Sequence, residues 1–331
     1  RWIHLSGNRS LNMRVLLAGG AGFIGSHIAD ALLARGDEVV AVDNFATGRR
    51  DNVAHLSGNA KFTLIEHDIT LPWPTHQALA EKFDAVLDYA SPASPNDFAT
   101  MPLEILAVGS TGTRNLLDRA KADNAVFFLT STSEVYGDPL VHPQPETYWG
   151  NVSSIGPRSC YDEAKRFSEA LTMAYHRVHG VDVRIVRIFN TYGERMRPND
   201  GRVVNTFVVQ ALRGEPLTLH GDGSQTRSFC HVTDEVRGLM ALLDTKYNMP
   251  VNVGNPGEFT MRELAELVIE LTGSSSDIIS VALPPERDGD PLQRKPDITL
   301  ATEILDWTPT ISLRDGLQRM IDHFVEVEGI S

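Results

Sequence analysis

Short apolar runs alternate with segments of helical periodicity as far as about Asn190. The runs that we expect to form buried strands cover residues 14–18, 38–42, 62–66, 85–89, 126–130 and 183–188. Apolar positions recur every three or four residues in segments 24–34, 103–122 and 161–179, which indicates helices. This alternation predicts an α/β fold, in which a Rossmann-type, doubly wound parallel sheet carries helices on both faces.

The pattern changes after about Asn190, where turn-forming residues become frequent. They gather in the segments ERMRPNDG, HGDGSQ, GNPGE and PPERDGDP. Further helices are predicted over residues 203–212, 233–243, 261–272 and 313–327. We therefore expect a Rossmann domain over residues 13–189. Residues 190–331 are expected to form mainly a smaller C-terminal α/β lobe, with some segments returning to the Rossmann domain.

The composition is that of a globular protein, with 42% hydrophobic and 22% charged residues among 331. No apolar run approaches the roughly 20 residues that span a bilayer, so we expect no membrane segment. The net charge of −13 argues against a nucleic-acid partner. Cys160 and Cys230 form no zinc-binding pattern, so we expect no metal site and a reducing, cytoplasmic location. Met13 has the character of a natural start, and residues 1–12 are expected to be a tag or a disordered leader.

A glycine-rich segment follows the first predicted strand. Gly19, Gly22 and Gly25 form a GxxGxxG pattern that opens the first helix, whose N-terminus can face a pyrophosphate. Asp43 ends the second strand, 24 residues after Gly19, where a carboxylate can hold the hydroxyls of an adenosine ribose. This arrangement favours NAD over NADP, although the neighbouring Arg49 leaves NADP open. The alternative is a glycine turn that binds no ligand.

Two residue pairs carry candidate chemistry. Tyr161 and Lys165 lie four apart at the start of a predicted helix, so their side chains share one face. A neighbouring ammonium group favours the tyrosine phenolate, which makes this pair suited to proton transfer at an alcohol. Thr132 and Glu134 follow the fifth predicted strand, at the edge where open α/β sheets bind ligands. The alternatives are a capping hydroxyl for Thr132 and a solvated turn acid for Glu134.

The chain resembles the extended short-chain dehydrogenase/reductase family and, within it, the UDP-glucuronic acid decarboxylases. The resemblance runs from about Arg14 to Phe324. Its most specific segments are GGAGFIGSH, VDNFATGRRDNV, ASPASP, STSEVYGDPLVHPQPETYWGNV, GPRSCYDEAKR, RIFNTYGERMRPNDGRVVNTF, GDGSQTRSF and QRKPDI. The resemblance implies an NAD-binding Rossmann domain, a substrate-binding C-terminal lobe and a homodimer.

The resemblance also implies roles for individual residues. Thr132, Tyr161 and Lys165 are expected to form the oxidation machinery, with Glu134 as an acid/base or positioning group. Arg294 is expected to face the carboxylate of the sugar. The expected cofactor contacts are Gly19, Gly22, Phe23, Ile24, Gly25, Asp43, Asn44, Thr47, Gly48, Asp68, Ile69, Tyr89, Ala90, Ser91, Tyr161 and Lys165. The expected substrate contacts are Pro92, Ser94, Glu134, Asn190, Arg202, Arg227 and Arg294.

The implied reaction converts UDP-glucuronate into UDP-xylose. Oxidation at C4 gives a 4-keto sugar whose C6 carboxylate lies β to a ketone and is therefore readily lost as carbon dioxide. Thr132 and Tyr161 can stabilise the resulting oxyanion. Return of the hydride to C4 regenerates NAD, and Arg294 can fix the carboxylate by charge-assisted hydrogen bonds.

The chain departs from the family pattern in one segment, and several alternative functions remain open. Phe98 and Thr100 stand where relatives often carry tyrosines, which puts a hydrogen bond to the sugar ring in doubt. A nucleotide-sugar 4,6-dehydratase is the nearest alternative, but Ser133 replaces the aspartate that its proton transfer requires. A 4-epimerase needs no arginine for a carboxylate. An NAD-sensing protein without catalysis needs no Tyr–Lys pair, and a decarboxylase of another nucleotide uronate stays open.

Overall fold

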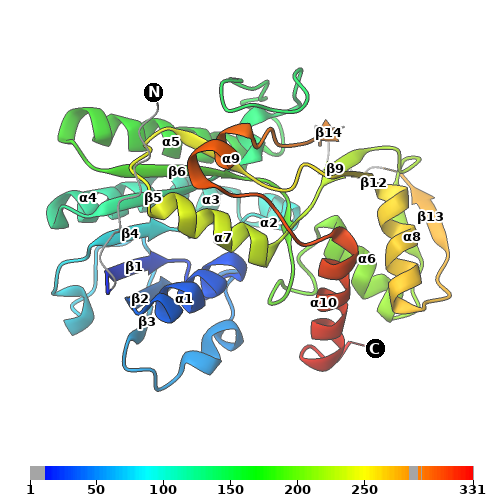
Figure 1. Ribbon diagram of the computed structural model, residues 1–331, viewed down its shortest axis with the longest axis horizontal. Coiled ribbons are helices and arrows are strands. Elements are labelled where there is room, and N and C mark those ends of the chain that lie inside the picture. Colours follow the sequence, from blue (N-terminus) through cyan, green and yellow to red (C-terminus); the bar gives the residue numbers. More distant parts are fainter. Residues whose placement is uncertain (1–11, 283–289, 292, 331) are drawn as a thin grey trace.

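The computed structural model describes residues 12–282, 290–291 and 293–330. Its centre is a seven-stranded parallel sheet with the order β11-β6-β5-β4-β1-β2-β3 (Figure 1). The strands are β1 (Arg14–Ala18), β2 (Glu38–Asp43), β3 (Phe62–Glu66), β4 (Ala85–Asp88), β5 (Val126–Thr132), β6 (Val183–Ile188) and β11 (Pro250–Val253). The strand order reverses beside β1, which places a ligand crevice at the carboxyl ends of β1 and β4.

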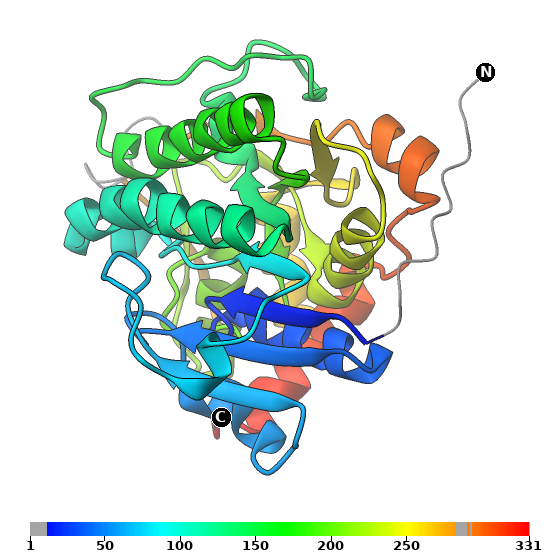
Figure 2. The ribbon, with the colours of Figure 1, turned by 90° about the vertical axis from the view of Figure 1, so that its left-hand side faces the viewer.

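Helices cover both faces of this sheet (Figure 2). One layer contains α3 (Pro102–Ala107), α4 (Thr113–Asp123) and α5 (Ser159–His179), and the other contains α1 (Phe23–Arg35), α7 (Val232–Leu243) and α9 (Thr299–Leu305). Because a parallel sheet is buried on both sides, its strands are nearly continuous apolar runs. In β1, the side chains of Val15, Leu16 and Leu17 are fully buried, and alternate residues enter opposite core layers.

The C-terminal lobe has a core of its own. Helices α6 (Val203–Leu212), α8 (Met261–Thr272) and α10 (Leu313–Glu326) pack there with a pair of parallel strands, β8 (Leu217–His220) and β13 (Ile278–Val281). Phe207, Leu264 and Leu317 are buried in the centre of this core. Figure 1 shows the lobe beside the large sheet. Residues of both parts line one cavity.

Short strands connect the two parts. They are β7 (Thr191–Tyr192), β9 (Thr226–Ser228), β10 (Cys230–His231), β12 (Glu258–Thr260) and β14 (Gln293–Arg294). Strand β11 comes from the second half of the chain but joins the edge of the large sheet, and α7 packs against α1 on its face. Strands of two or three residues carry no periodicity, so the sequence did not predict them.

The expected helix over residues 103–122 is interrupted in the structure. It begins as α3, passes through a π-helical turn at Val108–Gly112, and continues as α4. A Cβ atom at Gly109 would lie 2.8 Å from the Cβ of Ala164, so glycine at this turn permits the close approach of α5. Pro95–Thr100 forms a further short helix, α2, that the sequence did not predict.

The expected leader over residues 1–12 lies outside the described residues except for Asn12. Among the helices that the structure describes, none combines the length and apolar character that a membrane span requires.

Candidate active site

A cavity of about 490 Å³ lies between the large sheet and the C-terminal lobe. Its walls contain the glycine-rich loop after β1, the ends of β4 and β5, the start of α5, and the segment that follows β6. All sixteen residues expected from the sequence to contact the cofactor line this cavity. The expected substrate contacts Pro92, Glu134, Asn190, Arg202 and Arg227 line it as well.

The glycine loop leaves no space for side chains. Gly19 has φ +78°, and a Cβ atom there would lie 2.6 Å from the carbonyl carbon of Tyr89. A Cβ atom at Gly25 would lie 2.0 Å from the Gly19 oxygen, so the loop packs directly against the first turn of α1. Gly22 caps α1 without a side-chain hydrogen bond, which keeps the helix N-terminus accessible from the cavity. This cradle fits a pyrophosphate group.

Asp43 stabilises the same loop through hydrogen bonds with backbone N–H groups. Its two carboxylate oxygens accept hydrogen bonds from the backbone nitrogens of Ala21, at 2.9 Å, and Phe45, at 2.8 Å. Burial raises the pKa of Asp43, and these two hydrogen bonds oppose the rise. Because Asp43 also lines the cavity, it combines a structural role with the position expected for a ribose contact.

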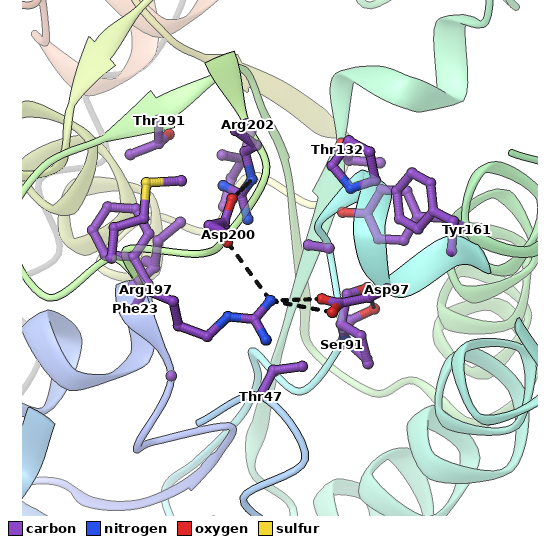
Figure 3. A pocket seen from close by; sticks show the side chains of 18 of the residues that line it. Phe23, Thr47, Ser91, Asp97, Thr132, Tyr161, Thr191, Arg197, Asp200 and Arg202 are labelled. Atoms are coloured by element: carbon purple, nitrogen blue, oxygen red, sulfur yellow. Dashed lines mark hydrogen bonds and ion pairs between the residues drawn. The ribbon is translucent and has the colours of Figure 1, made fainter. Parts of the chain in front are cut away.

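The proposed proton-transfer residues lie together at the end of β5. Figure 3 shows Thr132 and Tyr161 side by side, and a hydrogen bond joins their side chains. Helix α5 carries both Tyr161 and Lys165, whose Nζ lies 5.9 Å from the centre of the Tyr161 ring. Lys165 Nζ donates a 2.9 Å hydrogen bond to the carbonyl oxygen of Thr130. The three side chains are buried, so water has little access to them.

The electrostatics of Tyr161 differ from the sequence expectation. Burial raises its pKa to about 12, and the hydrogen bond from Thr132 only partly opposes this effect. Burial also lowers the pKa of Lys165, while the nearby Asp88 carboxylate raises it. The pKa of Tyr161 therefore lies above its ordinary value of 10.0, because desolvation of the phenolate outweighs the groups that favour it.

Phe98 forms part of the wall beside Tyr161. The two rings stack with their centres 4.9 Å apart and an angle of 19° between their planes. Thr100 is exposed and does not line the cavity, and its hydroxyl donates to the backbone oxygen of Asn96. The departure from the tyrosine pattern at Phe98 therefore lies at the site, whereas the departure at Thr100 does not.

Glu134 lies between two arginines. Its Oε2 accepts hydrogen bonds from Arg158, at 2.7 Å, and Arg294, at 3.2 Å. Burial by itself raises the pKa of this carboxyl, but the charges of Arg294 and Arg158 outweigh burial and lower the pKa to about 2. Glu134 is therefore ionised at neutral pH and points its charge towards the cavity that it lines.

Two expected substrate residues do not line the cavity. Arg294 is 1% exposed and lies behind Glu134, where it donates to the carbonyl oxygens of Ser133, at 2.7 Å, and Gly137, at 2.8 Å. The geometry does not support the expected direct contact between Arg294 and a sugar carboxylate. Ser94 caps helix α2 and donates to the backbone oxygen of Asp200, which is a structural role.

Sequence reasoning missed several charged residues in the cavity wall. Arg197 donates two hydrogen bonds to Asp97, at 2.9 and 3.2 Å, and lies 3.8 Å from Asp200, as Figure 3 shows. Asp97 lies 100 residues from Arg197 in the sequence, so no local pattern indicates this pair. Arg158 was also missed, although it lies one helical turn before Tyr161 and that spacing predicts a shared face.

Comparisons with known proteins agree with this site. Residues 16–320 match the family described as GDP-mannose 4,6 dehydratase. UDP-glucuronic acid decarboxylase 1 of Arabidopsis thaliana is 53% identical over 94% of this chain and 70% of its own length. UDP-glucuronic acid decarboxylase 1 of Danio rerio is 49% identical over 94% of this chain and 72% of its own length.

A solved structure extends the comparison. The UDP-glucuronic acid 4-epimerase of Bacillus cereus, in complex with UDP-glucuronic acid and NAD, superposes with a TM-score of 0.83. It is 29% identical, and the match covers 95% of this chain and all of the epimerase chain. The chain thus belongs to the GDP-mannose 4,6 dehydratase family of extended short-chain dehydrogenases/reductases, among the relatives of the UDP-glucuronic acid decarboxylases.

Proposed function

We propose that this protein binds NAD and converts UDP-glucuronate into UDP-xylose and carbon dioxide. The observation that carries the proposal is the position of an ionised Glu134, held by arginines, beside the Tyr161–Thr132–Lys165 group in one cavity. Uronate decarboxylation needs both an alcohol-oxidising group and a cationic environment for the carboxylate. The similarity to curated decarboxylases over nearly the whole chain supports the same reaction.

The cavity wall suits NAD. The tightly packed glycine loop sets the N-terminus of α1, where the first backbone N–H groups have no partner within the helix, against the cavity as a site for the pyrophosphate, and Asp43 is placed for the adenosine ribose. When bound, NAD supplies a reversible hydride acceptor, so the overall reaction requires no net oxidant. We propose that Tyr161 and Lys165, on α5, orient the other end of the cofactor towards the sugar.

We propose that Tyr161, as its phenolate, accepts the proton of the C4 hydroxyl and later returns it. The hydrogen bond from Thr132 and the charge of Arg202 favour the phenolate against burial, and Lys165 Nζ lies 5.9 Å from the centre of the Tyr161 ring. Once C4 is a ketone, the β-carboxylate leaves as carbon dioxide and its bonding electrons pass into the C4 oxygen. The hydroxyl groups of Thr132 and Tyr161 then stabilise that oxyanion. A proton taken up at C5 restores the C4 ketone, and reduction at C4, with the proton returned by Tyr161, gives UDP-xylose.

Glu134 is assigned an accessory role in the same cycle. Because its pKa is lowered to about 2, it carries no proton to donate at neutral pH, but it can accept one or orient a water molecule. This property separates the proposed reaction from a 4,6-dehydration, which needs a proton donor for the departing hydroxyl group. Arg294 positions Glu134 from behind, through hydrogen bonds to Ser133 and Gly137.

The nucleotide part of the substrate is assigned to the side of the cavity formed by the C-terminal lobe. Asn190, Arg202 and Arg227 line the cavity there, and two of them bring positive charge for a diphosphate. Arg202 is paired with Asp200 at 2.9 Å. Burial lowers the pKa of Arg227 to about 10, so Arg227 remains cationic at neutral pH. Pro92 contributes to the wall near the end of β4.

We also propose a homodimer that functions in the cytoplasm. Leu103 and Leu106 on α3, and Phe167 and Val178 on α5, are exposed apolar side chains on helices that pack together. A second copy of the same helix pair would cover them. A reducing compartment suits the two buried thiols, Cys160 and Cys230, which form no disulfide with each other.

A product assay tests the proposed function. The protein is incubated with UDP-glucuronate and NAD, without a reductant, and the sugar nucleotide and carbon dioxide are followed by mass spectrometry. We expect one carbon dioxide for each UDP-pentose and no accumulation of NADH. An isomer of unchanged mass would indicate a 4-epimerase instead. No reaction with the uronate, together with loss of water from a nucleotide hexose, would indicate a 4,6-dehydratase.

A further inference from the structure

A second group of charges lies in the cavity wall, apart from the group around Tyr161 and Glu134. Arg197, from the segment that follows β7, donates two hydrogen bonds to Asp97 on α2, at 2.9 and 3.2 Å. The guanidinium also lies 3.8 Å from Asp200. All three side chains belong to residues that line the cavity, and the proposed catalytic steps use none of them.

The two ends of this ion pair belong to different parts of the molecule. Asp97 follows strand β4 of the large sheet, whereas Arg197 precedes α6 of the C-terminal lobe. The hydroxyl of Ser94 joins the same two segments, because it donates to the backbone oxygen of Asp200. The side chains of Asp97 and Asp200 are only 8% and 6% exposed, whereas that of Arg197 is 24% exposed. Arg197 is therefore the end of the pair that solvent reaches.

The ion pair lies on the cofactor side of the cavity. Figure 3 shows the Arg197 side chain extending towards Asp97, with Phe23, Thr47 and Ser91 around it in this view. These three residues are expected cofactor contacts, and they come from α1, the segment after β2 and the segment after β4. A dinucleotide that contacts all three therefore passes the ion pair when it enters or leaves.

The charges of this group are already compensated. Asp97 binds Arg197, and Asp200 lies between Arg197 and Arg202, whose Nε is 2.9 Å from it. Two arginines thus face two carboxylates, and Arg197 brings no excess positive charge that would attract a phosphate. The pair is suited to hold two walls of the cavity together rather than to bind an anion.

We propose that Asp97 and Arg197 form a latch that retains the cofactor in the cavity until the sugar has been reduced again. The inference rests on the proposed function, because a cofactor that is reduced and reoxidised in one cycle has to stay beside the keto sugar. Each NADH that escapes after the loss of carbon dioxide leaves one UDP-4-keto-pentose unreduced. Because the latch lies on the path in both directions, it slows entry as well as exit and changes rates more than affinity.

The exchange kinetics of NADH test the latch independently of turnover. Protein loaded with NADH is mixed with an excess of NAD, and the decrease in the fluorescence of bound NADH gives the dissociation rate constant. Mixing NADH with the cofactor-free protein gives the association rate constant. We expect Asp97→Asn to raise both constants by about tenfold, the scale of one hydrogen bond between charged groups, and to change Kd by less than about threefold.

Three further variants complete the design. Arg197→Lys keeps the charge but lacks the guanidinium, so its rate constants should fall between those of the parent and Asp97→Asn. The double variant Asp97→Asn, Arg197→Gln should release NADH no faster than Asp97→Asn alone, because both changes open the same latch. Glu270→Gln is the matched control, since it breaks an exposed ion pair with Arg314 in the C-terminal lobe and should keep the parent rates.

The outcomes separate the latch from the proposed function. Slower release of NADH from Asp97→Asn would contradict the latch, because the freed Arg197 would then act as a phosphate contact. Faster release with unchanged association would also contradict it, since only the bound state would be affected. Should Asp97→Asn fail to fold, unchanged rates in Arg197→Lys would overturn the inference. If the parent does not convert UDP-glucuronate but the variants still exchange NADH faster in both directions, the proposed function fails and the latch stands.

Discussion

At the scale of single residues, the partners of each group decide the effect of burial. Burial raises the pKa of Tyr161 to about 12, whereas arginine charges lower the pKa of Glu134 to about 2 against the effect of burial. The difference comes from their partners, since two arginines bind Glu134 whereas Tyr161 has a neutral hydroxyl as its hydrogen-bond partner. The spacing of Tyr161 and Lys165 predicted that their side chains share one face of a helix. The sequence alone does not show how strongly each side chain is desolvated.

Removal of the Tyr161 hydroxyl group tests its assigned role. We expect Tyr161→Phe to reduce kcat by about 10²- to 10⁴-fold, the usual contribution of a positioned acid/base group. The phenylalanine ring keeps the stacking contact with Phe98, so the melting temperature and the affinity for NAD should stay close to those of the parent. Steady-state kinetics and calorimetric titration measure the two effects. A variant with nearly full activity would contradict the proton-transfer role.

Asp162 gives a prediction for the pH dependence of stability. Its pKa is about 7 in the folded protein and has an ordinary value of 3.8, so at intermediate pH the folded state binds more protons than the unfolded state. Stability that this group contributes at low pH is therefore lost as the pH rises from about 4 to about 7. We expect Asp162→Asn to gain stability relative to the parent over this range, by about 3 kcal/mol.

Urea unfolding at several pH values measures this effect. Glu134→Gln offers a related variant, because the charge of Glu134 is, after burial, the largest cause of the raised pKa of Asp162. The dependence on pH should be weaker in that variant. A difference between Asp162→Asn and the parent that stays constant from pH 4 to pH 7 would contradict the account.

At the scale of elements, α5 determines where the catalytic groups lie. The sequence predicted this helix and strands β1, β3 and β6 well, because each is a single apolar run or a regular periodic segment. The sequence did not predict the segments in which the backbone departs from regular geometry, such as the π-helical turn before α4. It also did not predict that Arg294 lies behind Glu134, because that contact joins strand β14 to a turn about 160 residues away.

The contact between Gly109 and α5 tests the importance of this packing. A Cβ atom at Gly109 would lie 2.8 Å from the Ala164 Cβ, one residue from Lys165. We expect Gly109→Ala to lower stability by about 1–3 kcal/mol, the usual cost of overpacking, and to lower kcat by displacing α5. Gly156→Ala is a suitable control, since its added Cβ meets the movable hydroxyl of Ser153. Equal behaviour of the two variants in thermal unfolding would argue against this role for Gly109.

At the scale of the whole molecule, two parts of the chain close around one cavity. The glycine loop and α5 belong to the part that the sequence predicted well, whereas Arg227 and the Asp97–Arg197 pair depend on how the C-terminal lobe packs against it. Packing of this kind is set by contacts between distant residues and has no local signal. The family resemblance therefore indicated a large part of the cavity wall, including its whole glycine-rich side, but the paired charges emerged only from the structure.

The exposed faces of α3 and α5 predict the assembly state. We expect the protein to elute as a dimer, and Phe167→Glu to shift it to the monomer, because a charge at an apolar contact must be desolvated without a partner. Size-exclusion chromatography with light scattering measures the mass of both forms. The control is Leu140→Glu, at an exposed apolar residue outside these two helices. A parent protein that is already monomeric would reject the dimer.

We propose that the sugar is oxidised at C4 and reduced again at the same carbon, with carbon dioxide lost in between. The decisive experiment uses UDP-glucuronate labelled with deuterium at C4, with product analysis by mass spectrometry and NMR. We expect UDP-xylose that retains the deuterium at C4 and is formed without net NADH. Loss of the label to the solvent, or a lasting UDP-4-keto-pentose, would contradict the complete cycle.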